Sequence, residues 1–234
     1  MRIIVNHVTR MTSPRICVAG VDVETFDHIR PTTPATDLIT RKLLRENGGP
    51  FGVGALVDLG RVKAEPNAPE TEDHGFVTAN ARRIEDITDD EYLAVLGEVS
   101  ATTLGDAFGP DLECVNHRKY AIEAGHGTRS LAVVQLRGSP QLHSNAWGKL
   151  LVELNDPDAP CSLSMTDIRF YENDQKTIKD DVMNDVNSRL SAGVDAFLML
   201  GLARAFVAQG YDRRLHFLQA NGLCLVDRAV GDLP

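Results

Sequence analysis

The sequence lacks any long apolar run, which argues against a membrane-spanning helix. No stretch approaches the roughly 18 consecutive apolar residues that such a helix needs. The start, Met1–His7, turns polar after three apolar side chains, too early for a secretory signal. We therefore expect a cytoplasmic protein with no membrane partner.

Cysteine is scarce, and the four residues of this type lie far apart. Cys17, Cys114, Cys161 and Cys224 each neighbour apolar residues and show no metal-type spacing, which predicts reduced, buried thiols. The seven histidines include no pair at the His-x-His or His-x-x-x-His spacing typical of zinc sites. We expect no metal and no cofactor.

Recognisable catalytic motifs are also missing. The glycine-rich segment 48–54 contains Pro50, which removes a backbone donor, and no Lys-Ser/Thr pair follows it. A structural loop is therefore favoured over a phosphate loop. Since there is no Gly-x-Ser-x-Gly nucleophile elbow either, we expect the protein not to be an enzyme.

Aromatic residues make up only 6% of the chain and the net charge is −9, which argues against a general nucleic-acid binder. The charge is uneven, however. Residues 51–110 hold 4 basic against 12 acidic side chains, whereas residues 1–50 hold 7 against 5. A local basic face is therefore compatible with the acidic total, although non-specific affinity for phosphates should be weak.

Short segments with alternating apolar and polar residues dominate the chain. This pattern predicts strands with one face in a core. Helix signals are few: a capping box at Thr88–Glu91 predicts a helix over 88–99, and apolar residues at Val182, Val186 and Leu190 predict another over 180–191. The fold class is mainly β with a few helices.

Gly, Pro, Ser and Asn cluster between Gly138 and Asn145, which is typical of a junction. Short strands punctuated by about one helix per half are typical of small oligonucleotide-binding (OB) barrels. We expect two such barrels fused in one chain: an N-terminal one over 1–140 with an acidic helical insert, and a C-terminal one over 141–234.

The first strands carry a cluster of His and Arg residues. Its members are His7, Arg10, Arg15, His28 and Arg30. Such a set can contact phosphates and base edges. It can equally form a polar network at the strand ends, with Arg30 paired to a nearby acid. The acids close in sequence are Asp22, Glu24 and Asp27.

The C-terminal half offers further candidates for base stacking. In a strand over 164–171, Arg169 and Tyr171 share one face, and Arg204 lies near Phe206. Phe170 and Phe206 are themselves better explained as core residues. Asn221-Gly222 is a typical tight hairpin turn.

Several strings resemble the bacterial dual OB-domain family. They are Asn6–Met11, Ile16–Gly20, His28–Pro31, Leu198–Phe206 and Phe217–Gly222. The resemblance covers both ends of the chain and is thin between about residues 60 and 125. It implies two OB barrels and, by analogy with the fold, nucleic-acid binding.

The leading hypothesis is a non-enzymatic module that binds single-stranded nucleic acid or a nucleotide, with a bacterial defence system as one setting for it. The expected site residues are His7, Arg10, Arg15, His28, Arg30, Arg169, Tyr171 and Arg204. One alternative is a protein-interaction adaptor that docks a partner enzyme, such as a nuclease, through sheet edges or through the acidic region 51–110. A third hypothesis is a nucleotide-processing enzyme with His7 and His28 as its acid/base pair.

Overall fold

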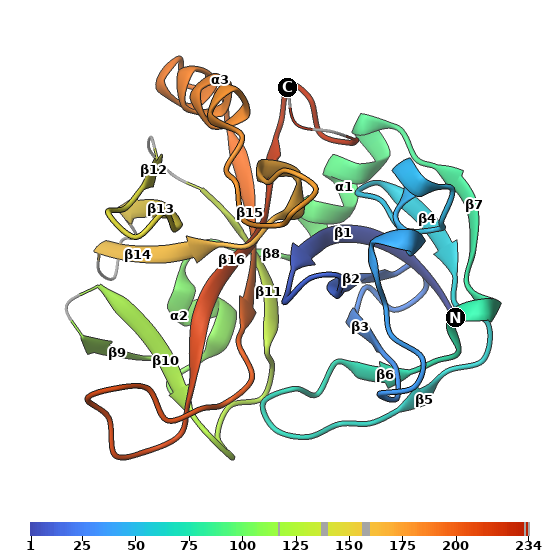
Figure 1. The fold of residues 1–234 in the computed structure, drawn as a ribbon, viewed down its shortest axis with the longest axis horizontal. Coiled ribbons are helices and arrows are strands. Elements are labelled where there is room, and N and C mark those ends of the chain that lie inside the picture. Colours follow the sequence, from blue (N-terminus) through green and yellow to red (C-terminus); the bar gives the residue numbers. More distant parts are fainter. Residues whose placement is uncertain (117, 137–139, 156–159, 232, 234) are drawn as a thin grey trace.

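The chain forms two β-sheets that lie side by side (Figure 1). The computed structural model describes residues 1–116, 118–136, 140–155, 160–231 and 233. Strands are far more numerous than helices, so the prediction of a mainly β fold is confirmed. In the described part of the chain, no helix is long and apolar enough to cross a bilayer.

The first sheet has seven strands in the order β5-β6-β3-β2-β1-β4-β7. Their bounds are β1 Arg2–Arg10, β2 Ile16–Asp22, β3 His28–Thr32, β4 Ala55–Asp58, β5 Lys63–Ala64, β6 Asp73–Gly75 and β7 Arg82–Asp86. The central strand β1 is buried on both faces. Ile3, Val5 and Val8 pack into the sheet's own core, whereas Ile4 packs into a cluster shared with the second sheet.

The second sheet has nine strands, seven of them in the order β12-β13-β14-β16-β15-β11-β8. The other two continue from one edge of β16, which pairs with β10, and β10 in turn pairs with β9. The bounds are β8 Ser100–Ala101, β9 Glu113–Asn116, β10 Lys119–Glu123, β11 Leu131–Gln135, β12 Gln141–Ser144, β13 Leu150–Asn155, β14 Pro160–Met165, β15 Ala196–Leu202 and β16 Leu215–Leu225.

The structure contains helices at both predicted places. They are α1 Asp89–Val99 and α3 Asp180–Ser191, with a short α2 Leu104–Phe108 that was not predicted. The capping box is formed: the Thr88 side chain accepts from the Glu91 amide, and the Glu91 carboxylate accepts from the Thr88 amide. Tyr92 and Leu96 of α1 are fully buried in the cluster that both sheets share, so this helix joins the two sheets.

Sheet membership changes at α1, between β7 and β8. The predicted boundary at 140/141 instead falls between β11 and β12 of the second sheet, and residues 137–139 lie outside the described residues. The difference arises because β11 pairs with the distant β15, a partnership that local composition cannot reveal. The assignment of either sheet to an OB barrel stays a prediction.

Two local predictions are wrong. The strand expected over 164–171 ends at Met165, and Ile168–Phe170 is a 3-10 turn because the Asp167 carboxylate accepts from the Arg169 amide. Asn221-Gly222 is not a hairpin turn but lies inside β16, next to a register shift against β15. Gly222 serves close packing there, since a Cβ on it would lie 3.0 Å from that of His7 on β1.

The four cysteines form no disulfide among the described residues. Burial is confirmed for Cys161 and Cys224, whereas Cys17 is only half-buried and Cys114 is exposed. The prediction fails at Cys114 because β9 is an edge strand in the described structure and its exposed residues alternate, which places Cys114 and Asn116 on the face toward solvent.

Native thiol titration should therefore show one fast site. Cys114 should react first, because burial raises the pKa of Cys224 to about 12 and leaves almost no thiolate at neutral pH. The Cys114→Ser variant should lose the fast phase, and all four thiols of the wild type should react in denaturant. Rapid labelling of Cys161 or Cys224 in the native protein would contradict the structure.

Candidate functional site

A cavity of about 460 Å³ opens between the two sheets, and four arginines line it. We call it the arginine pocket after Arg10, Arg15, Arg30 and Arg204, four of the eight predicted site residues. The first sheet contributes the end of β1, the start of β2 and β3. The second contributes Thr166 after β14, the segment after β15, and Gln219 and Asn221 of β16.

Asp73 bridges two of these arginines across the sheets. Its Oδ1 accepts from Arg30 Nε at 2.5 Å, and its Oδ2 accepts from Arg204 Nη2 at 2.6 Å. The other end nitrogen of Arg204, Nη1, lies 3.1 Å from Glu70 Oε1. Arg30 therefore does pair with an acid, but not with Asp22, Glu24 or Asp27, because β6 lies beside β3 and places Asp73 opposite Arg30.

The pocket keeps unpaired positive charge. Arg30 is 6% exposed, yet its Nη2 has no hydrogen-bond partner within the described structure. Arg15 is exposed and makes no ion pair with any described residue. Against four guanidinium groups stand the two carboxylates of Glu70 and Asp73, so the balance favours an anion.

The Tyr171 ring and the backbone of Gln175 hold the Arg10 side chain in place. Its guanidinium carbon lies 4.1 Å from the centre of the Tyr171 ring, and its Nη1 donates to the Gln175 carbonyl at 2.8 Å. Tyr171 is 2% exposed and its hydroxyl donates to the Met165 carbonyl. The ring of Tyr171 therefore positions Arg10, and Tyr171 does not line the arginine pocket, so its role as a stacking surface for bases stays a prediction.

Arg169, another predicted site residue, does not line the arginine pocket. Its side chain is 9% exposed and makes a two-pronged ion pair with Asp167, whose carboxylate lies 2.7 Å from Nη2. The remaining end donors reach the carbonyls of Leu223 and Gly231. Its donors thus tie the 3-10 turn to β16.

His7 and His28 do not line the arginine pocket. His7 is 2% exposed on β1, and neither ring nitrogen has a partner within the described part of the chain. Burial, assisted by His28 and Arg30, lowers its pKa to about 3. His28 lines a separate cavity with Asp22 and Arg129, and burial followed by Arg129 lowers its pKa to about 4.

Sequence reasoning missed the pocket's acids and amides. Glu70 and Asp73 lie in a stretch that reads as a solvated loop, yet both are buried. Asn221 accepts from Thr166 Oγ1 at 3.0 Å and lies over Gly201, where a Cβ would collide with the Asn221 amide. The polar alternation of β16 is the signal that could have placed Gln219 and Asn221 on one face.

Comparison with known proteins adds no family: no protein-family model matches the sequence, and no curated protein is detectably similar. The resemblance to dual OB-domain proteins therefore stays a prediction. Within the described residues, no three His, Cys, Asp or Glu side chains converge as metal ligands. What the geometry itself offers is a site for an anion.

Removal of the bridging carboxylate should destabilise the fold. Asp73→Ala leaves Arg30 buried and unpaired, so the free energy of unfolding should fall by about 3–5 kcal/mol in urea titrations. The matched control is Glu24→Ala, which breaks the exposed pair with Arg2 and should change stability by less than about 0.5 kcal/mol. Equal effects of the two substitutions would show that Asp73 is not a buried bridge.

His7 should make stability depend on pH. Its pKa is about 3 in the folded state against about 6.5 when unfolded, so only the unfolded state takes up the proton between these values. Stability should therefore fall as pH drops below 6.5, by at most about 1.4 kcal/mol per pH unit from this group. His7→Phe should show a shallower decline between pH 6.5 and 4.5 in thermal unfolding. An unchanged slope would contradict a buried neutral His7.

Proposed function

We propose that the chain is a non-enzymatic binding module that holds a phosphate-bearing ligand, a nucleotide or single-stranded nucleic acid, in the arginine pocket. One observation carries the proposal: four arginines, contributed by both sheets, line a single cavity whose described lining contains no Asp or Glu. Charged donors that face a cavity without a lining carboxylate favour an anion there.

Phosphate suits these arginines better than a monovalent anion does. A guanidinium offers a planar fork of donors that matches phosphate oxygens. Arg10 is fixed over Tyr171 and Arg30 is fixed by Asp73, so their donors are oriented before the ligand arrives. Pre-orientation lowers the entropy lost on binding.

The remaining lining supports a ligand with an organic part. Both sheets contribute apolar side chains to it, namely Met11, Ile16, Leu38, Ile39, Leu131 and Leu202. Polar groups come from Thr166, Gln219 and Asn221, which offer hydroxyl and amide contacts to a sugar or to a base edge. The volume also lies within the range of ordinary ligand pockets.

The electrostatics favour selective rather than general binding. The chain carries a net charge of −9, so a polyanion is repelled from most of the surface. The arginine pocket is a local exception, because four arginines line it. The acid/base alternative has less support, because His7 and His28 lie outside this pocket and both stay neutral near pH 7.

Arg15→Ala is the cleanest test of this proposal. Arg15 is exposed and lacks an ion pair to any described side chain, so the variant should fold normally. Binding of a short oligothymidylate, followed by fluorescence anisotropy, should weaken by about 1.5–3 kcal/mol if a charged hydrogen bond is lost. The dependence of affinity on salt should flatten by roughly 0.7 per phosphate contact removed.

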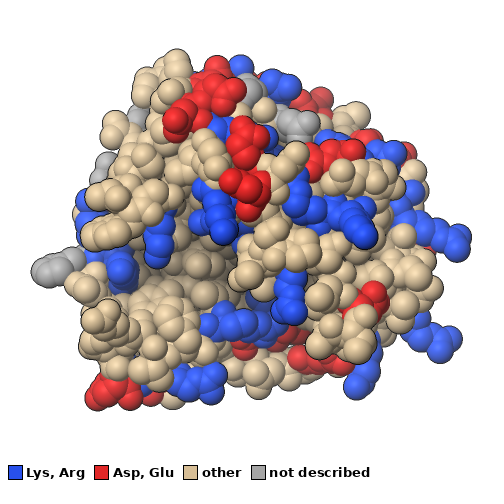
Figure 2. Space-filling view, viewed as in Figure 1, with Lys and Arg blue, Asp and Glu red and all other residues tan. Residues whose placement is uncertain are grey.

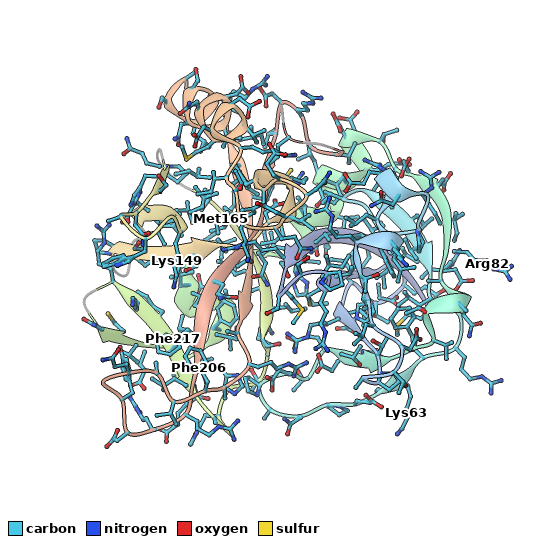
Figure 3. The ribbon with its side chains drawn as sticks, in the orientation of Figure 1. Lys63, Arg82, Lys149, Met165, Phe206 and Phe217 are labelled. Carbon is cyan, nitrogen blue, oxygen red and sulfur yellow. The ribbon has the colours of Figure 1, made fainter. Side chains whose placement is uncertain are left out.

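Arg82→Ala is the matched control, since Arg82 is exposed on β7 at the far edge of the first sheet (Figure 3). It should leave binding and its salt dependence nearly unchanged. Inorganic pyrophosphate should compete with the oligonucleotide. Equal losses from both arginine variants, or no binding of either phosphate probe to the wild type, would refute a localised phosphate site.

A further inference from the structure

An aromatic cluster lies on the loop between β15 and β16 and at the start of β16. Phe206 is 49% exposed, and its ring centre lies 5.4 Å from that of Phe217 at an interplanar angle of 42°. Tyr211 packs edge-on against Phe217 at 5.6 Å. Phe206 is therefore not the core residue that its sequence context predicts.

The backbone holds Phe206 in this position. Its amide donates to the Leu215 carbonyl, and the Leu215 amide donates back to the Phe206 carbonyl. Arg214 Nη2 also donates to the Ala205 carbonyl. A large apolar ring that is fixed in place and left half open to solvent is typical of a contact surface.

The aromatic cluster adjoins the arginine pocket along two chain segments. On β16, Phe217, Gln219 and Asn221 are half-buried and alternate with buried residues, so they share one face. Gln219 lines the pocket, and Phe217 lies two residues before it, about 7 Å away along the strand. After β15, Arg204 lines the pocket and Phe206 follows two residues later.

The face is also hollowed and bordered by positive charge. Figure 2 shows a depression over β14 and β16, with Lys and Arg side chains around its rim. Figure 3 places Phe206 and Phe217 together at its lower side and Lys149 on the opposite side. Arg214, beside Phe206, is exposed and forms no ion pair with the rest of the described chain.

We infer that Phe206 and Phe217 form a base-stacking subsite, and that the ligand of the arginine pocket is single-stranded nucleic acid that runs from the pocket across this face. The inference rests on the proposed function and specifies its ligand. A phosphate bound by the arginines brings the adjoining base to the rings. Every base presents a flat π-face, so a stacking platform accepts a strand regardless of its sequence.

The rings offer aromatic base stacking, which the arginine pocket does not. Among the described residues its lining contains no aromatic side chain, so a base held there stacks on a guanidinium plane. An acidic protein with a single phosphate pocket gains little affinity from long-range attraction. Stacking adds affinity that does not depend on net charge.

The test compares two labelled probes of equal length and charge, an oligothymidylate and an abasic phosphodiester strand. Phe206→Leu keeps an apolar side chain but removes the π-face, and Phe206→Ala removes both. Each variant should weaken oligothymidylate binding by roughly 5- to 150-fold and leave abasic-strand binding unchanged. Val207→Ala is the matched control, because Val207 is the adjacent residue and is 58% exposed.

Equal losses with both probes, or no loss with either, would overturn the stacking subsite. Arg15→Ala distinguishes failure of the stacking subsite from failure of the proposed function. This variant should weaken the binding of both probes, because it removes a phosphate contact and leaves the rings unchanged. A wild-type protein that binds pyrophosphate but neither strand would refute the inference and leave the phosphate site intact. A protein that binds none of the three would refute both.

Discussion

The carboxylate of Asp73 is the contact on which the pocket depends. It holds one arginine from each sheet, Arg30 on β3 and Arg204 after β15, and both pairs are shielded from solvent on the carboxylate side. Together with Glu70, Asp73 balances the charge of these two guanidinium groups, so the surplus positive charge of the pocket comes from Arg10 and Arg15. The contact therefore joins the sheets around a cavity whose other arginines attract anions.

The pocket also resolves an apparent conflict in the charge of the chain. Net acidity would exclude a general nucleic-acid binder, yet binding depends on the local field and not on the total. Most of the acidic excess lies in residues 51–110, and two of these acids, Glu70 and Asp73, are buried where they orient arginine. The remaining acids keep polyanions away from surfaces that have no site to offer them.

The sequence predicts local features well and long-range partners poorly. The Thr88 capping box and the apolar stripe of α3 depend on neighbours within a turn, and both helices form where the pattern places them. The cluster of arginines was found because residue type alone marks them. The sequence does not predict which of them line the arginine pocket. The donors of Arg169 are engaged by Asp167 and by backbone carbonyls, and Arg30 pairs with an acid on a strand that local patterns read as a loop.

The burial of β1 on both faces has a consequence for how the chain folds. One face of this strand is covered by its own sheet's core, but the other needs the distant β16, whose Gly222 lies against His7. Until β16 arrives, Ile4 and its neighbours stay open to water and to other chains. Contacts between segments so far apart slow folding, because the intervening chain must first be gathered at an entropic cost. The arginine pocket between the sheets is therefore assembled late, and a nascent or truncated chain that lacks β16 should be prone to aggregation.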